Sequence, residues 1–392
     1  MSSTGARTAT TDGAHMQRFV EDVFRSLHRV EQRRWARAYL WALSHGSGKK
    51  TPRRMARADS LPSAAAHGLH QFINASPWDW QPVRHRLAQR VAAEAAPYAW
   101  TVADLTIPKN GEHSVGVHRV DAPTGQPVNG QRAVGLFLAC NGHSFPVDWS
   151  LVLSGPWDWD QQLRRRARIP DEEKERPVGA YVLDYAAEAV MLPHAAGLPW
   201  VLDLTRCDDA AGVLAGLARE RLDMVCEVDP GQVVLAGQHT PAVRPVGELM
   251  RMRHARQPHV MVQQTPEGRP KVVPIHAYVG TVRLPQLAGT DGAVRTYRIL
   301  ERPAPDGHLP ARYWITNLTD RPVEQVLSLV RARTATQSGI SVLKERFGVL
   351  DFEGRSFPGW HHHMTMASAA YAHQYLGDTS EGVRAELSRA AS

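Results

Sequence analysis

Apolar residues recur at helical spacing through the first quarter of the chain. The segment FVEDVFRSLHRVEQRRWARAYLWALS carries an apolar stripe that a helix would bury on one side. Gly46 ends this pattern, and Pro52 favours the start of a short basic helix, PRRMARA. The sequence therefore predicts a bundle of short helices over residues 15–97. The polar residues 1–14 that precede it are expected to form a disordered tail.

From residue 98 the pattern changes to short apolar runs that are typical of strands. AWTVADLTIP and HSVGVHRV are β-like, and QRAVGLFLA is apolar on both faces, which predicts a buried central strand. A helical region follows, and then a strand (PWVLDL), a helix and another strand (DMVCEV). Three strands followed by alternating helix and strand are typical of an α/β core with a mixed sheet. We assign the first part of this core to residues 98–230.

Residues 231–310 differ in composition from the preceding segment and are rich in Pro, Gly and Val. Short segments such as HVMVQQT and KVVPIHAYVG indicate strands, so we interpret this stretch as a β-rich insertion. RYWITNL then resumes the core, and residues 311–392 are expected to supply its last strand and helices.

The composition is that of an ordinary globular protein. The 392 residues are 43% hydrophobic and 22% charged, and no run approaches the roughly 18 apolar residues needed to cross a bilayer. The first residues lack the apolar core of a signal peptide, and the three cysteines form no CxxC pair. We therefore expect a cytoplasmic protein with reduced thiols and no membrane partner.

The basic excess is concentrated near the beginning of the chain. The formal net charge is +7, and residues 15–100 hold 14 Lys and Arg against 6 Asp and Glu, a local net of +8. A basic module before a near-neutral body is typical of a phosphate-contacting protein, although arginines that decorate solvated helices give the same count. Arg53, Arg54 and Arg57 on the short basic helix indicate a helix-turn-helix-like arrangement and are candidate DNA contacts.

Two acidic residues stand at the ends of apolar strands, Asp104 in TVADLTIPK and Asp203 in PWVLDLTR. Metal-dependent phosphoryl-transfer enzymes place their ligands in this way, because a rigid sheet fixes the carboxylate oxygens that Mg²⁺ prefers. On local sequence alone, the simpler interpretation is favoured, in which each Asp merely ends a strand or caps the next helix.

Four segments of the sequence carry a resemblance to a known family. They are TVADLTIPKNGEHSVGVHRV, TGQPVNGQRAVGLFLA, FPVDWSLVLSGPWDWDQQLRRRARIP and EGRSFPGWHHH, in this order. From about Arg34 to His373 the chain resembles bacterial insertion-sequence transposases of the 701 type, in the DDE endonuclease superfamily. The resemblance implies a ribonuclease-H-like mixed-sheet core interrupted by a β-rich insertion, preceded by a helical N-terminal DNA-binding domain.

The resemblance also implies an activity. Such transposases cut double-stranded DNA at transposon ends and join the freed 3′-hydroxyl to a target, using three carboxylates that hold two Mg²⁺ or Mn²⁺ ions. DNA is then the expected partner, a homodimer on the DNA is one possible assembly, and the DNA-bound protein is nucleoid-associated.

The chain departs from the family pattern at the first catalytic aspartate. Aligned without gaps from Lys109, that aspartate falls on Ala103. A one-residue deletion places it on Asp104 instead, and we prefer Asp104 because it is the carboxylate available there. The two alternatives differ physically, since a shift of one residue along a strand reverses the face on which the side chain lies.

The second and third acidic positions match the family pattern to different degrees. Asp203 is a credible second ligand, although the Tyr-Gly that usually follows is missing. The family pattern of Arg, three residues, Glu, six residues, Lys falls on Arg333, Gln337 and Lys344, so an amide replaces the third carboxylate. Glu353 is the nearby acid that is a candidate substitute. Weaker metal binding is expected if Gln337 is the ligand.

Other expectations concern DNA contacts and the last block. Lys109, Arg333 and Lys344 are expected to contact DNA phosphates. The three consecutive histidines 361–363 point about 100° apart on a helix and cannot converge on one ion, so the block EGRSFPGWHHH is expected to pack the last helices beside the active site.

Three functions remain open from the sequence. The first is an active transposase, and the second is a catalytically impaired, transposase-derived DNA-binding or regulatory protein. The third is a metalloenzyme that acts on a small molecule in the same pocket.

Overall fold

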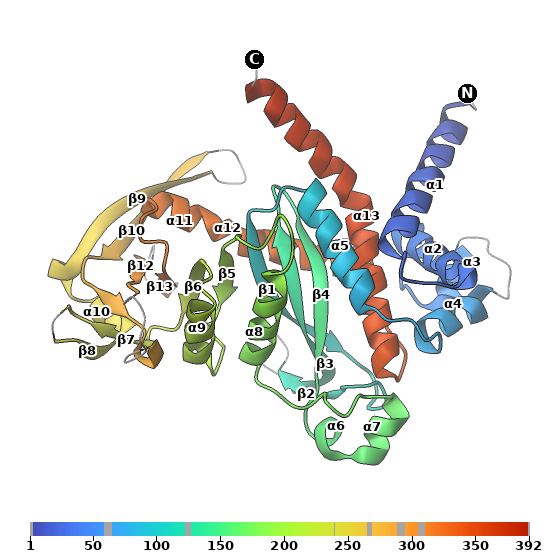
Figure 1. Ribbon diagram of the computed structural model, residues 1–392, viewed down its shortest axis with the longest axis horizontal. Helices are drawn as coiled ribbons and strands as arrows, with labels where there is room; N and C mark the ends of the chain where they lie inside the picture. Colours follow the sequence, from blue (N-terminus) through green and yellow to red (C-terminus); the bar gives the residue numbers. More distant parts are fainter. Residues whose placement is uncertain are drawn as a thin grey trace.

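The computed structural model describes residues 3–58, 65–121, 127–238, 240–264, 269–287, 295–304 and 310–390. A central sheet lies between a group of N-terminal helices and a β-rich region, and the long last helix crosses beside the N-terminal helices (Figure 1). The prediction of an α/β protein with a large mixed sheet is therefore confirmed.

Five helices form the N-terminal part, as the apolar stripes predict. Helix α1 begins at Ser3, inside the segment for which the sequence predicts a disordered tail. The five helices are α1 (Ser3–Val23), α2 (Val30–His45), α3 (Pro52–Ala58), α4 (Ala65–Asn74) and α5 (Gln81–Glu94).

The central sheet combines antiparallel and parallel pairing. Its core order is β4-β3-β1-β5-β6, in which β4, β3 and β1 are antiparallel and β1, β5 and β6 are parallel. The strands and helices of this region are β1 (Ala99–Pro108), β2 (His118–Asp121), β3 (Pro127–Ala139), β4 (Ser144–Val152), α6 (Pro156–Trp159), α7 (Gln161–Ala167), α8 (Val178–Ala189), β5 (Trp200–Asp203), α9 (Ala210–Arg219) and β6 (Met224–Val228).

The hydrophobic pattern predicts β1, β3, β5 and β6, but it does not predict β4. This strand contains Pro146 and Asp148, two residues that are uncommon in sheets. Pro146 lies where the pairing of β3 with β4 shifts register, so the missing donor falls at an irregularity of the ladder. Asp148 forms an ion pair with Arg84 of α5.

The β-rich region extends the same sheet. Strand β13 pairs with β6, so the order continues as β6-β13-β12-β10-β9, and β7, β8 and β11 form a small second sheet. The elements are β7 (Val233–Ala236), β8 (Ala242–Pro245), α10 (Val246–Leu249), a 3₁₀ turn (Arg253–Ala255), β9 (Arg256–Gln264), β10 (Pro270–Tyr278), β11 (Val282–Arg283), a 3₁₀ turn (Pro285–Leu287), β12 (Arg298–Arg302) and β13 (Arg312–Thr316).

Three helices complete the chain: α11 (Val323–Leu329), α12 (Arg331–Arg346) and α13 (Phe357–Ala390). The opposite faces of β1 show which helices cover which side of the sheet. Trp100 donates its indole N–H to the carbonyl of Ala195, in the segment after α8. The Oγ1 of the next residue, Thr101, lies 2.6 Å from Oγ1 of Thr336 on α12. Helices α8 and α12 therefore cover opposite faces.

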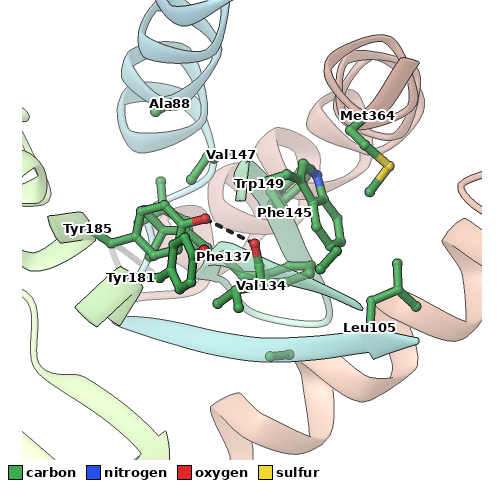
Figure 2. Close-up of a cluster of buried hydrophobic side chains, with 14 of the residues drawn as sticks. Ala88, Leu105, Val134, Phe137, Phe145, Val147, Trp149, Tyr181, Tyr185 and Met364 are labelled. Carbon is green, nitrogen blue, oxygen red and sulfur yellow. Dashed lines mark hydrogen bonds between the residues drawn. The ribbon is translucent and has the colours of Figure 1, made fainter. Parts of the chain in front are cut away.

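One continuous core joins the sheet to the helices on both sides. Phe145, Val147 and Trp149 of β4 lie among side chains of β1, β3, α5, α8 and α13 (Figure 2). The same core includes apolar residues of α1, α2 and α4. The N-terminal helices therefore share their hydrophobic interior with the sheet and with α13.

Candidate functional site

A cavity of about 280 Å³ opens where β1 and β5 separate. These strands pair at only two positions, Trp100 with Trp200 and Thr101 with Val201. Beyond them the space is lined by residues of β1, β5, α8 and α12, so the cavity is bordered by helices of both faces. Four of the residues singled out in the sequence line it: Asp104, Asp203, Arg333 and Gln337.

The two aspartates in this cavity belong to opposite faces of the sheet. Thr101 pairs with Val201, and Thr101 faces α12. Because side chains alternate along a strand, Ala103 and Asp203 point to the α12 face, whereas Asp104 points to the α8 face. Strand β1 pairs with β3 over ten consecutive residues without a bulge, so this alternation is uninterrupted. Of the two candidate positions on β1, Ala103 and Asp104, the one that shares a face with Asp203 and Gln337 is Ala103.

Asp203 forms an ion pair with Arg333 of α12. Its Oδ2 accepts a short hydrogen bond from the Arg333 guanidinium. Its Oδ1 accepts from the backbone N–H of Thr205 at 3.0 Å and from the Thr205 hydroxyl at 2.6 Å. Both oxygens of this carboxylate therefore have donors from within the protein.

Glu227 is a site residue that the sequence reasoning missed. It lies on β6 directly opposite Asp203 in the parallel ladder, so it shares the α12 face, and only 6% of it is exposed. Arg312 donates to both of its oxygens at 2.6 Å, and Arg333 also donates to Oε2. The only sequence signal is an acid inside the apolar strand MVCEV.

Asp104 belongs to a separate and more exposed ion pair. Its Oδ2 lies 2.6 Å from the guanidinium of Arg132 on β3, and both side chains are more than one third exposed. Burial raises the pKa of the nearby Cys207 thiol, and the negative charges of Asp209, Asp208 and Asp104 add to this shift. The thiol is therefore protonated at neutral pH.

Gln337 and Lys344 follow Arg333 along α12. Gln337 lies one turn beyond Arg333 and lines the cavity, whereas Lys344 is exposed and lies about 16 Å from Arg333 along the helix axis. Helix α12 is held close to the sheet, since a Cβ on Gly339 would come within 2.9 Å of the carbonyl oxygen of Ser144. The position of Gln337 is fixed by this packing.

Glu353 and Lys109 lie away from this cavity. Glu353 forms an ion pair of 2.7 Å with Lys49 and lines a second cavity, of about 510 Å³, beside α3 and α4. Lys109 donates to the carbonyl of Phe352, and burial together with Lys49 lowers its pKa to about 8. Five residues of strand, about 16 Å, separate Lys109 from Asp104. The structure thus does not bring Glu353 to the position of a third carboxylate.

The arginines expected to bind DNA lie on α3. Arg53, Arg54 and Arg57 are exposed, whereas Met55 and Ala56 of the same helix are buried. The helix therefore presents a basic surface to solvent. Arg53 also lines the cavity that contains Glu353.

The histidines of the last block are core residues. His361 stacks on Trp80, His362 stacks on Trp78, and His363 lies 3.0 Å from the hydroxyl of Tyr39. Their rings have separate partners, as expected for successive helix positions. No group of three or more His, Cys, Asp or Glu in the described residues is arranged to hold a metal ion.

The residues present do not fit a centre for two divalent cations. Such a centre needs several carboxylate oxygens that converge without internal counter-charges. Here Ala103 and Gln337 carry no charge, and Asp203 is paired with Arg333. The acidic side chains of the cavity are neutralised by arginines of the same chain.

The protein is thus an α/β protein in which acidic residues lie side by side on β5 and β6 of a mixed sheet, and α12 packs on the sheet after the β-rich region. The chain belongs to the family described as DDE superfamily endonuclease, whose sequence model matches residues 22–293. This shows the predicted superfamily.

Solved structures give a more distant likeness. The chain is similar to the piggyBac transposase in a synaptic complex with hairpin DNA, with 12% sequence identity and a TM-score of 0.43. The aligned region covers 89% of this chain and 66% of the transposase chain, just under two thirds of its length. Comparison with curated proteins gave no match. No helix among the described residues is long and apolar enough to cross a membrane.

Proposed function

We propose that this protein is a transposase-type DNA-binding protein that does not cleave DNA by the two-metal mechanism. Its membership of the DDE superfamily endonuclease family supports an origin in DNA transposition. The single observation that carries the proposal is that Ala103, Asp203 and Gln337 occupy the three positions expected to be acidic, and of these three only Asp203 is a carboxylate.

The strand order supports a ribonuclease-H-like core. Strands β4, β3 and β1 form an antiparallel meander, β5 and β6 follow in parallel on the other side of β1, and α12 returns to the sheet after the insertion. In the resemblance to transposases of the 701 type, the three acidic residues belong to β1, β5 and α12. The ungapped alignment, with Ala103 in the first position, agrees with the side-chain faces better than the alternative with Asp104.

The metal-dependent alternative is cleavage and strand transfer at transposon ends. It requires Mg²⁺ or Mn²⁺ to activate water or a 3′-hydroxyl and to stabilise the leaving oxygen. When bound, two ions would supply that activation and charge stabilisation. Asp203 remains in place, but the alanine and the amide beside it provide neither the charge nor the oxygen set that two ions need.

The first test restores the missing charges. We expect no nicking of supercoiled or inverted-repeat DNA by the wild-type protein in Mg²⁺ or Mn²⁺. The double variant Ala103→Asp/Gln337→Glu supplies two carboxylates beside Asp203 and is expected to bind Mn²⁺ and nick DNA in its presence. The matched control is Ala103→Asn with Gln337 unchanged, which has the same shape without the two charges.

Metal-dependent nicking by the wild-type protein would contradict the proposal. Wild-type protein that nicks DNA in Mg²⁺, and that loses this activity on Asp203→Ala substitution, would establish the metal-dependent alternative. Nicking should be read on agarose gels and Mn²⁺ binding by electron paramagnetic resonance, so that metal binding and cleavage are separated.

DNA binding is tested at the basic surface of α3. Replacing Arg53, Arg54 and Arg57 by alanine is expected to weaken duplex DNA binding by about tenfold or more and to reduce the slope of log affinity against log salt by up to about 3. The measurement is fluorescence anisotropy at several salt concentrations. The control replaces Arg165 and Arg166, which are exposed on α7. Unchanged affinity in the triple variant would show that the basic surface of α3 does not bind DNA.

A further inference from the structure

We propose that Arg333 occupies a cation position between Asp203 and Glu227 and excludes a divalent metal ion from these two carboxylates. The inference deepens the proposed function, because it names the group that replaces metal ions as the counter-charge of the site. Asp203 and Glu227 would form a site for one metal ion, and this site is latent because Arg333 blocks it.

The two carboxylates are neighbours across a parallel ladder. Asp203 of β5 and Glu227 of β6 are directly paired, and adjacent strands lie about 4.8 Å apart. Both side chains point to the α12 face. Two carboxylates at this separation can share one cation, and one guanidinium already bridges them: Arg333 donates to Oδ2 of Asp203 and to Oε2 of Glu227.

The charges of this cluster are balanced without a metal ion. Glu227 also accepts two hydrogen bonds from Arg312, so two carboxylates face two guanidinium groups. A guanidinium remains charged at any pH at which the protein is folded. Deprotonation therefore cannot free the carboxylates, and a metal ion has to displace Arg333 physically.

The backbone of Arg333 is not free to move away. Thr336 on the same helix lies 2.6 Å from Thr101 and 2.8 Å from Ser144 through its hydroxyl, and Gly339 allows α12 to contact β4 closely. These contacts anchor the helix one turn beyond Arg333. The arginine is thus presented to the carboxylates by a rigid element, as a fixed internal cation.

The test removes this cation and asks whether a metal takes its place. Arg333→Gln keeps a long polar side chain without the charge, and Lys344→Gln makes the same change of charge elsewhere on α12. We expect at least about tenfold tighter Mn²⁺ binding in Arg333→Gln than in the wild type. Binding is measured by electron paramagnetic resonance of free Mn²⁺ and by the shift of the melting temperature with Mn²⁺. Lys344→Gln is expected to bind Mn²⁺ no more tightly than the wild type does.

The second variant, Arg333→Gln/Asp203→Asn, is expected to lose the gained binding. Mn²⁺ binding by the wild type that depends on Asp203 would overturn the proposal even if the variants proved unstable. No gain in Arg333→Gln would also overturn it, because no latent site would exist. DNA affinity measured without metal ions tests the proposed function separately, so the two can fail independently.

Discussion

Replacing Arg84 by methionine is expected to lower the free energy of unfolding by about 4 kcal/mol, because it leaves a largely buried carboxylate without its partner. Arg84 lies on α5 and is 2% exposed. Its Nη1 lies 2.6 Å from Oδ1 of Asp148, whose side chain is itself only 13% exposed. The same nitrogen donates to the carbonyl of Trp149 at 2.7 Å.

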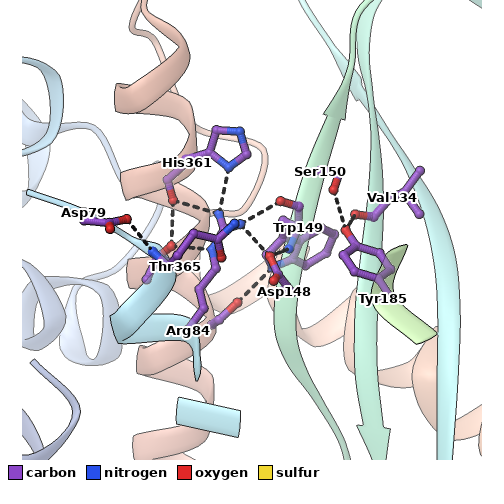
Figure 3. A network of polar contacts seen from close by, with 11 residues as sticks. Asp79, Arg84, Val134, Asp148, Trp149, Ser150, Tyr185, His361 and Thr365 are labelled. Carbon is purple, nitrogen blue, oxygen red and sulfur yellow. Dashed lines mark hydrogen bonds and ion pairs between the residues drawn. The ribbon is translucent and has the colours of Figure 1, made fainter. Parts of the chain in front are cut away.

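The guanidinium also reaches α13 (Figure 3). Its Nε donates to Oγ1 of Thr365 at 2.7 Å, and its Nη2 donates to the carbonyl of His361 at 3.1 Å. One side chain thus joins α5, β4 and α13, and methionine fills the volume but provides none of these donors. The expected effect is large because all of these hydrogen bonds are lost at a position that water does not reach.

Urea unfolding followed by circular dichroism measures this effect. The control is Arg86→Met, since Arg86 on the same helix forms an ion pair with Asp22 that is only partly buried, with side chains 31% and 26% exposed. We expect a loss of about 1 kcal/mol or less for this control. A loss of similar size in the two variants would show that the buried network does not contribute as described.

Acidification from pH 7.5 to pH 5 is expected to destabilise the protein through the buried histidines of α13. Burial lowers the pKa of His361 far below 6.5, and it lowers the pKa of His363 to about 4. In the unfolded chain both rings become protonated near pH 6.5. The stability they contribute is therefore complete above pH 6.5 and is lost as the pH falls toward 4, at about 2 kcal/mol for each ring by pH 5.

His362 is affected by burial in the same direction as its two neighbours. Burial lowers its pKa to about 4, although Nδ1 and Nε2 each lie 2.8 Å from a backbone carbonyl oxygen, of Ile73 and Trp78. A ring that donates to both carbonyls is an imidazolium, so these contacts oppose the effect of burial. His362 therefore adds to the acid sensitivity of His361 and His363.

The measurement is the free energy of unfolding at several pH values. His363→Asn should lower stability at pH 7.5 and reduce the pH slope between 6.5 and 5 by about one proton. His67→Asn, at an exposed position of α4, is the control and should leave the slope unchanged. Equal stability of the wild type at pH 7.5 and pH 5 would contradict the prediction.

The main strands were predictable because their residues are apolar on both faces. Strands β5 and β6 are buried along nearly their whole length, and a short apolar run between turns is sufficient to identify such strands. The β-rich character of residues 231–310 was predictable from short Val-rich segments, although several of their side chains, such as Val260, Val262 and Val272, are exposed. That this region extends the central sheet through β13 depends on pairing between distant residues, which local patterns do not contain.

The candidate site was predictable only in part. Asp203 was predictable from its place at the end of an apolar strand, and Arg333 and Gln337 from the resemblance to transposases. The structure brings all three to one cavity. Glu227 was missed because its partners Arg312 and Arg333 are 85 and 106 residues away. The side of the sheet on which Asp104 lies was also not predictable from the sequence, since it depends on the register between β1 and β5.

Arg164 illustrates how a charge run can mislead. Three consecutive arginines suggest a solvated surface, yet Arg164 is 4% exposed. Its guanidinium donates to the backbone carbonyls of Trp157, Pro170 and Glu173. The residue closes the loop around α7, while Arg165 and Arg166 remain exposed. Every residue has a backbone carbonyl, so the sequence does not identify these acceptors and this role was not predictable.

The packing of α13 has a consequence for the order in which the chain acquires its structure. His363 of α13 contacts Tyr39 of α2, and His373 lies 3.1 Å from His15 of α1, so helices α1 and α2 pack against a helix that is synthesised much later. About 260 residues separate α5 from α13, which corresponds to roughly 10–50 s of translation. During that interval the N-terminal helices carry apolar surface with no final partner.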